Sequence, residues 1–284
     1  MGLNNEPVVD LHLHTIFSDG LLTPEEMVLE AHKLGLAAVA ITDHDSVDGI
    51  KPAQETGKRL KLEIVPGVEM SSTVAGVDVH ILGYYLDIES PEVLDFFALV
   101  RKKRRERAER MVAKLNELGV RVTMERVAHF ARAGAIGRPH VAQALVEAGA
   151  VANINEAFSR FIGYDGPAYF PKMRLTPLEA IGFIQRHGGL AFIAHPGTYH
   201  NDDAVYAAIA AGADGIEVWH PEHDKQASDH YAELAWKNGL LVSGGSDCHG
   251  GAKNGRMFLG QITVPYKHLA AIKRLARKRE PSRT

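Results

Sequence analysis

Short apolar runs rich in β-branched residues alternate with longer stretches of helical periodicity along most of the chain. The runs lie at residues 7–13, 37–42, 62–67, 77–83, 190–194, 214–218 and 240–244. The stretch 24–34 between two of them starts as a helix does, because Thr23 suits the N-cap and Pro24 suits the first helical position. This alternation is typical of α/β proteins with a parallel sheet. The pattern predicts about seven strands that alternate with helices, as in a (β/α) barrel.

The alternation stops between residues 91 and 170, where helical patterns follow one another without a strand pattern between them. Within 99–119, the apolar residues recur at helical spacing: Val100, Ala108, Met111, Leu115 and Leu118. A further helical segment covers 137–151, and the turn-rich "GYDGPAYFP" at 163–171 ends the block. We therefore expect a barrel domain made of residues 1–90 and 171–284, interrupted by a helical insertion at 91–170.

Two histidines stand at the end of the first apolar run, in "VVDLHLHTIFSDG" at residues 8–20. Successive side chains of a strand point to opposite faces, so His12 and His14 project on the same side, about 7 Å apart along the chain. Two imidazoles on one side can bind one metal ion. A pair of this kind on its own is better explained as a capping residue and a solvated residue, so the rest of the chain decides.

Further candidate ligands occur at or beside the other predicted strands. With the first pair they make six histidines and three carboxylates: His12, His14, Asp19, His44, Glu69, His80, His195, Asp247 and His249. The carboxyl ends of the strands of a parallel barrel meet at one face, so these residues would converge. Nine such residues at equivalent positions are hard to explain as coincidence. Other histidines fall inside predicted helices and receive no such role: His32, His129, His187, His230 and His268.

The number and type of these ligands predict a centre with more than one metal ion. Nine ligands exceed what one ion needs, which indicates two or three divalent ions that share carboxylates. A mixed set of imidazoles and carboxylates suits Mn²⁺, Zn²⁺ or Fe²⁺. Cys248, between Asp247 and His249, would point away from both on an extended stretch, so we do not expect a thiolate ligand.

Composition narrows the class of protein. The 284 residues hold 32 Lys and Arg against 35 Asp and Glu, a formal charge of -3, so the whole protein is not a polycation that coats nucleic acid. The single cysteine excludes an intrachain disulfide. The amino terminus lacks the pattern of a signal peptide, and no run of about 18 apolar residues occurs. We expect a soluble cytoplasmic protein without membrane contact and without an obligate protein partner.

The ordered motifs "DLHLHTIFSDG", "ITDHD", "GVEMS", "HILGYY", "AHPG" and "GSDCHG" resemble those of the PHP (polymerase and histidinol phosphatase) family of metal-dependent phosphoesterases. The resemblance covers nearly the whole chain. It implies a distorted seven-stranded (β/α) barrel with a trinuclear metal site and a ligand at every position of the family pattern. One ion would be held by His12, His14, Glu69 and Asp247, a second by Glu69, His80 and His195, and a third by Asp19, His44 and His249.

Within the family, the insertion and the segment "IGYDGPAYFP" resemble the 3′,5′-nucleoside bisphosphate phosphatases and the related 5′-to-3′ exoribonuclease that trims short RNAs. This resemblance implies hydrolysis of a phosphate ester by a metal-bound hydroxide, with Mn²⁺ as the first choice of ion. The nine ligands would form the catalytic centre, and the substrate would be a nucleotide or short RNA. Arg138 and His140 in "GRPH" would reach from the lid-like insertion to the substrate phosphate, because the arginine fork matches phosphate oxygens.

Several alternatives stay open at this point. Histidinol-phosphate phosphatase is the second choice, an amidohydrolase would want a metal-bridging lysine where this chain has Glu69, and a non-catalytic metal-stabilised module would show gaps in the ligand set. "GRPH" could simply start a helix. The basic run at 101–107 is more simply a solvated helix face than a contact to a nucleic-acid backbone. The proton donor to the leaving oxygen could be a metal-bound water, His140 or His220.

Overall fold

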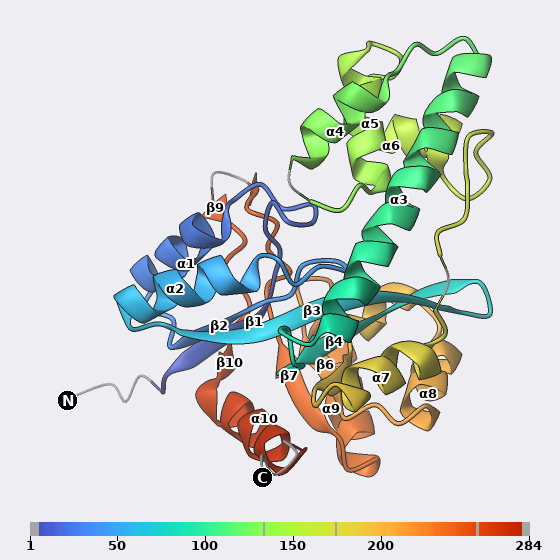
Figure 1. Ribbon diagram of the computed structural model, residues 1–284. Coiled ribbons are helices and arrows are strands. Elements are labelled where there is room, and N and C mark those ends of the chain that lie inside the picture. Colours follow the sequence, from blue (N-terminus) through green and yellow to red (C-terminus); the bar gives the residue numbers. More distant parts are fainter. Residues whose placement is uncertain (1–5, 133, 174, 254–255, 280–284) are drawn as a thin grey trace.

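Eight strands form one sheet that curves into a nearly closed barrel in the computed structural model, which describes residues 6–132, 134–173, 175–253 and 256–279 (Figure 1). The sheet order is β10-β1-β2-β3-β4-β5-β6-β7. The bounds are β1 Val8–Leu13, β2 Ala38–Ile41, β3 Glu63–Val74, β4 Val77–Tyr84, β5 Leu190–Ile193, β6 Gly215–Trp219, β7 Leu241–Gly244 and β10 Val264–Pro265. All seven strands expected from the sequence are present. A bridge between Leu13 and Cys248 brings the end of β1 against the segment that follows β7.

The expectation of a uniformly parallel sheet is wrong at β4, which is antiparallel to both β3 and β5. β3 and β4 form a long hairpin whose turn is Ala75 and Gly76, both with positive φ. A turn this short joins only antiparallel strands, whereas a parallel neighbour needs a crossover. The short strand β10 and the small hairpin of β8 (Ala252–Lys253) and β9 (Arg256–Met257) were not expected either.

Helices cover the sheet on its outer side. They are α1 Pro24–Lys33, α2 Ile50–Leu60, α7 Pro177–Arg186, α8 Asp202–Ala210, α9 Lys225–Lys237 and α10 Tyr266–Arg279, with a short 3-10 helix, η2, at Pro196–Tyr199. α1 begins as its sequence predicts, because Thr23 and Glu26 form a capping box. One buried apolar cluster joins the sheet to α1, α2, α7, α8 and α9, and a second joins it to α10. No helix of the described residues is both long and apolar enough to cross a membrane.

The block between the two parts of the barrel is helical, as the sequence predicts. It consists of α3 Pro91–Glu117, α4 Met124–Ala131, α5 Arg138–Glu147, α6 Ile154–Ala157 and a π-helical turn, η1, at Phe158–Ile162. The start of α3 packs on the barrel through Val93 and Phe97. Its second half carries Met111 and Leu115 into a separate apolar cluster with α4, α5 and η1. α3 therefore connects the barrel to a second core, which lies beyond the open end of the barrel (Figure 1).

This arrangement predicts that the second core contributes strongly to stability. Leu115 is fully buried in it, whereas Leu99 on the same helix is 47% exposed. Leu115→Ala should lower the free energy of unfolding by about 2 to 5 kcal/mol, because it leaves a cavity. Leu99→Ala should change it by less than about 0.5 kcal/mol. Urea unfolding followed by circular dichroism measures both, and equal midpoints for the two variants would contradict the separate core.

Candidate metal centre

The end of β1 places two imidazoles side by side at the mouth of the barrel. The Nε2 atoms of His12 and His14 lie 3.1 Å apart, and both side chains are fully buried. The loop that follows β1 then folds back over them. Gly20 permits this fold, because a Cβ atom there would lie 2.5 Å from the carbonyl oxygen of His14. The Asp-Gly pair that ends the motif thus brings Asp19 above the two histidines.

The carboxylate of Glu69 occupies the middle of the centre. Its side chain is 1% exposed, and its two oxygens lie 2.7 to 3.3 Å from ring nitrogens of five histidines: His12, His14, His44, His80 and His195. Glu69 lies inside β3, not after it as expected, because β3 is longer than the sequence predicted, and His80 lies inside β4 as expected. The antiparallel pairing of β3 with β4 brings them together, because His80 faces Ser71, two residues from Glu69.

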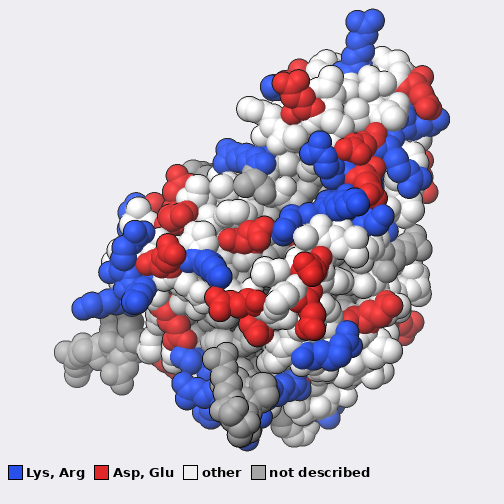
Figure 2. Space-filling view, in the orientation of Figure 1, with Lys and Arg blue, Asp and Glu red and all other residues white. Residues whose placement is uncertain are grey.

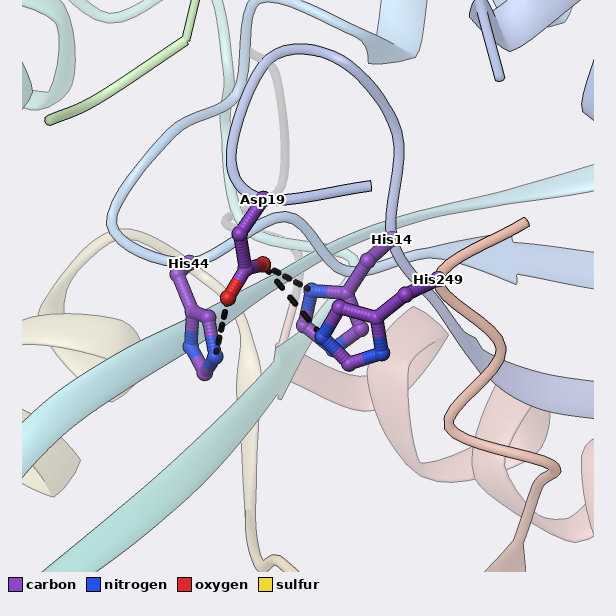
Figure 3. A group of neighbouring side chains, drawn as sticks. All are labelled: His14, Asp19, His44 and His249. Atoms are coloured by element: carbon purple, nitrogen blue, oxygen red, sulfur yellow. Dashed lines mark ion pairs between the residues drawn. The ribbon is translucent and has the colours of Figure 1, made fainter. Parts of the chain in front are cut away.

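Asp19 lies between three histidines at the outer side of the centre (Figure 3). Its carboxylate oxygens are 3.3 Å from His249 Nε2 and 3.9 Å from both His14 Nδ1 and His44 Nε2. The rings of His14 and His249 stack with their centroids 4.2 Å apart. The segments after β1, β2 and β7 therefore meet here, as the barrel interpretation requires.

Asp247 approaches from the segment after β7. Its Oδ1 lies 3.0 Å from His14 Nε2 and 3.4 Å from His12 Nε2. The thiol of Cys248 is buried in the apolar core and its sulfur accepts the backbone N–H of Gly250, and Cys248 belongs to none of the ligand groups found among the described residues. All nine residues named from the sequence thus lie in one cluster.

The donor set fits divalent cations. Three groups of side chains have ligand atoms within 4.8 Å of one another: His14, Asp19, His44 and His249; His12, His14 and Asp247; and His44, Glu69 and His80. Within the described residues, Asp19 Oδ1, His44 Nδ1 and Asp247 Oδ1 are buried without a hydrogen-bond partner. A cation would satisfy such atoms. The groups differ from the ligand sets implied by the family resemblance in three ways: His14 also lies with Asp19, His44 takes the place of His195 beside Glu69 and His80, and Glu69 is absent from the group of His12, His14 and Asp247.

The electrostatics of the centre keep its carboxylates ionised. Burial raises the pKa of a carboxyl, but the surrounding histidines hold the pKa values of Glu69 and Asp247 well below their usual range. Burial alone would lower the pKa of His14, yet Asp247 and Glu69 raise it to about 10. Burial lowers the pKa of His80 to about 4. The cluster is therefore a set of anions and imidazoles whose protons a cation can replace.

Two buried aspartates that sequence reasoning missed hold the loops that carry the ligands. Asp43 accepts the N–H of Thr15 at 2.7 Å and the hydroxyl of Ser18 at 2.6 Å, which fixes the loop before Asp19. Asp10 accepts the N–H of Ser246 at 2.9 Å and its hydroxyl at 2.6 Å, which fixes the start of the loop of Asp247. The signal was an acidic residue next to each ligand motif, in "VVDLH" and "ITDHD".

A cluster of positive side chains borders the centre on the side of the insertion. Arg104 of α3 donates to the carboxylate of Asp45, 3.1 Å from Nε, and Asp45 directly follows His44. Lys172 pairs with Asp78 at 3.3 Å, two residues before His80. The basic run at 101–107 is thus only partly a solvated face: Lys102, Lys103 and Arg105 are exposed, while Arg104 and Arg107 turn inward. The inward pair continues the apolar stripe of Val100, Ala108 and Met111 at helical spacing, a signal that the sequence analysis left unused.

Arg138 lies within this cluster. Its guanidinium is 4.9 to 5.7 Å from the ring centroids of Phe158, Tyr164 and Tyr169. It lines a small polar hollow together with Arg107, Lys172, Asp78, Thr73, Gly76, Tyr164 and Tyr169. Burial and the charges of Arg138 and Arg104 lower the pKa of Arg107 to about 10. Three cations, Arg107, Arg138 and Lys172, line this hollow with one carboxylate, Asp78. The cations repel one another, and an anionic ligand would reduce this repulsion.

His140 lies two residues after Arg138 and is 3% exposed. Its Nδ1 accepts the backbone N–H of Gly137 at 3.0 Å, so "GRPH" does start a helix, α5. Burial lowers the pKa of His140; the charge of Arg104 lowers it further, and the charge of Asp19 opposes the shift. The motif thus has a structural role at the start of α5, and the charge of Asp19 acts on His140 in the same turn.

Comparison with known proteins agrees with this geometry. The model of the PHP domain matches residues 10–162, a segment that holds six of the nine clustered residues. The 5'-3' exoribonuclease Rnm of Escherichia coli (strain K12) is 33% identical over 253 residues, which cover 87% of this chain and 86% of the relative. The 3',5'-nucleoside bisphosphate phosphatase of Chromobacterium violaceum is 33% identical over 254 residues, 87% of this chain and 89% of the relative.

The fold is also found in solved structures. A crystal structure from Bifidobacterium adolescentis, described as a metal-dependent phosphoesterase, has a TM-score of 0.84 and 33% sequence identity, and the match covers 94% of this chain and 96% of that one. The match of the family model, the full-length relatives and this structure agree on one family. The chain belongs to the PHP domain family, and its fold is the distorted α/β barrel of that family with a helical insertion.

Proposed function

We propose that this protein is a metal-dependent phosphoesterase that removes the 3′ phosphate of nucleoside 3′,5′-bisphosphates and shortens 5′-phosphorylated RNA from its 5′ end. The observation that carries the proposal is the position of the cation cluster beside the nine-residue centre. Relatives named for each of these two activities are similar over most of their length.

The nine clustered residues would hold two or three divalent ions. Mn²⁺ is our first choice, with Zn²⁺ and Fe²⁺ as alternatives, because imidazole and carboxylate ligands suit all three. Bound ions of this kind activate water and stabilise the negative charge that develops on phosphate oxygens. Glu69 is placed to share its two oxygens between ions, since each oxygen faces different histidines.

The positive cluster would bind the second phosphate of the substrate. Arg138 offers a planar fork that lies against the rings of Phe158, Tyr164 and Tyr169, and its N–H groups would donate to phosphate oxygens. Arg107 and Lys172 line the same hollow. Asp78 ties Lys172 to β4 two residues from His80, about 7 Å along the strand. A molecule with two phosphates on one ribose could therefore reach both the metal centre and the hollow.

The insertion at 91–170 would act as a lid on the barrel domain of 1–90 and 171–284, because it carries Arg107, Arg138 and His140 to the mouth of the barrel. The substrate is then a nucleotide or a short RNA, and we place the reaction in the cytoplasm. Figure 2 supports a local anion site rather than a coating surface, because acidic and positive side chains are interspersed on this face of the barrel and no continuous positive surface covers it.

The alternatives fit less well. Histidinol phosphate carries one phosphate and a cationic tail, which the positive hollow would repel. An amidohydrolase would bridge its ions with a lysine, but Glu69 occupies the middle of this centre. A non-catalytic module would have gaps in the ligand set, whereas all nine positions are filled by ligating side chains.

A comparison of three substrates tests the proposal. Adenosine 3′,5′-bisphosphate should lose its 3′ phosphate to give AMP, and a short 5′-phosphorylated RNA should be shortened from its 5′ end. Histidinol phosphate should be a poor substrate. We would measure kcat/KM for all three at one Mn²⁺ concentration. A tenfold or greater advantage of histidinol phosphate would overturn the substrate assignment while leaving the metal centre intact.

Removal of the arginine fork should weaken substrate binding without loss of metal. Arg138→Ala should raise KM and lower kcat/KM for the bisphosphate about tenfold to hundredfold, because a charge-assisted contact to phosphate contributes about 1.5 to 3 kcal/mol. The matched control is Arg126→Ala on the exposed side of α4, where Arg126 pairs with Glu147. If Arg138→Ala and Arg126→Ala have equal kcat/KM, Arg138 does not bind the substrate phosphate, and "GRPH" only starts a helix.

Loss of a shared ligand should remove metal and activity together. His14 belongs to two of the three ligand groups, so His14→Ala should bind at least one ion fewer per chain and lose hydrolysis. The exposed His32 of α1 is the control, and His32→Ala should keep both. Elemental analysis of protein from cells grown with excess manganese measures the number of metal ions per chain. Full occupancy in an inactive His14→Ala protein would assign His14 another role.

A further inference from the structure

β6 is the one long strand of the barrel that provides none of the nine clustered residues. The other six long strands, or the segments directly after them, each contribute at least one. The end of β6 instead carries two buried polar side chains, Glu217 and His220, which are 0% and 4% exposed. Glu217 contacts His12 at Nδ1, and His220 contacts Asp247 at Oδ2. The other atoms of these two ligands, His12 Nε2 and Asp247 Oδ1, face each other.

Glu217 contacts the rear nitrogen of His12. Its Oε1 and Oε2 lie 3.0 Å and 3.2 Å from His12 Nδ1, and Oε2 also accepts the backbone N–H of His195 at 2.7 Å. An ionised carboxylate only accepts hydrogen bonds, so the proton on His12 Nδ1 points at Glu217. The lone pair of His12 Nε2 is then directed toward His14 and Asp247, the side where a cation would bind.

This support is particular to His12. The Nδ1 atoms of three other clustered histidines have a hydroxyl or carbonyl oxygen as their nearest partner: His14 Nδ1 lies 3.4 Å from Ser18 Oγ, His195 Nδ1 lies 3.1 Å from Thr198 Oγ1, and His249 Nδ1 lies 2.9 Å from the carbonyl oxygen of Asp247. The carboxylates of Asp19 and Asp247 lie farther away, 3.9 Å from His14 Nδ1 and 3.7 Å from His249 Nδ1, and both belong to the nine. Among the described residues of the nine, only His12 has a ring nitrogen in contact with a carboxylate that is itself outside the nine; His195 contacts Glu217 through its backbone N–H. An anionic partner makes an imidazole a more basic ligand than a hydroxyl or carbonyl does.

His220 acts on the same ligand group from its other side. Its Nδ1 accepts the backbone N–H of Glu222 at 3.1 Å, so the ring proton is on Nε2. Nε2 lies 3.3 Å from Asp247 Oδ2 and donates to it. Asp247 Oδ1 is thereby left to face His12 and His14. Both side chains of β6 thus orient the group of His12, His14 and Asp247.

We propose that Glu217, with His220, is a positioning residue that sets the affinity of the ion held by His12, His14 and Asp247. The proposal rests on the proposed metal centre. Glu217 adds one negative charge behind this ion and fixes the orientation of its imidazole ligand, and loss of such a partner typically weakens metal binding tenfold to hundredfold. The ion near Asp19, His44 and His249 has no contact with either side chain of β6 and should keep its affinity.

The test is a metal titration, which does not depend on catalysis. Metal-free wild-type protein and Glu217→Gln would be titrated with Mn²⁺ against a chelating dye, and bound metal would be counted after dialysis. The variant should show one binding step weakened tenfold to hundredfold, with the remaining steps unchanged. Asp214→Asn is the matched control, because Asp214 is a buried acid just before β6 whose partner is Arg279. It should lower stability and leave every binding step in place.

Each outcome decides between two statements. Wild-type affinity at every step in Glu217→Gln would overturn the positioning role, and so would an equal weakening of all steps. A wild-type protein that binds no divalent ion would overturn the proposed metal centre instead. If Glu217→Gln does not fold, Glu217→Asp keeps the charge but withdraws it from His12 and should weaken the same step. His220→Asn should weaken that step too, and by a smaller factor, because it removes a neutral donor.

Discussion

The burial of Glu69 is the constraint on which the rest of the structure depends. A carboxylate in the middle of a barrel is costly unless charged or hydrogen-bonding groups surround it. Five histidines from four different segments do so, and together with Glu69 in β3 their positions require β1 to β5 to meet at one mouth. The antiparallel hairpin of β3 and β4 contributes to this arrangement, because it places His80 opposite Ser71 and so brings its ring within 2.7 Å of Glu69.

The metal centre and the cation cluster are mechanically connected. Asp45 and Asp78 lie one and two residues from clustered histidines, and each holds a cation near the insertion. Asp78 and His80 lie in the same strand, β4, and Asp45 directly follows His44 in the turn after β2, so only short stretches of chain separate the two sites. A short separation of this kind favours a ligand of one length, since binding both ends depends on pre-organised groups.

The barrel supplies support as well as ligands. Asp10, Asp43 and Glu217 are buried acids that bind no proposed ion, yet each holds a loop or ring that carries a candidate ligand. Such groups are easily mistaken for structural polar residues, because they contact backbone and hydroxyl groups. Their position directly behind the candidate ligands is the reason for the part in metal binding that we propose for Glu217.

The sequence by itself determined the seven strands, the helical insertion and the nine clustered residues, because apolar periodicity and residue spacing are local properties of the chain. It did not determine the direction of β4, the sharing of Glu69 among five histidines, or the inward turn of Arg104 and Arg107. It also gave no sign of the contact between Glu217 and His12. Whether a buried acid supports a ligand or only the fold depends on which distant side chain it meets, and only the tertiary structure brings residue 217 to residue 12.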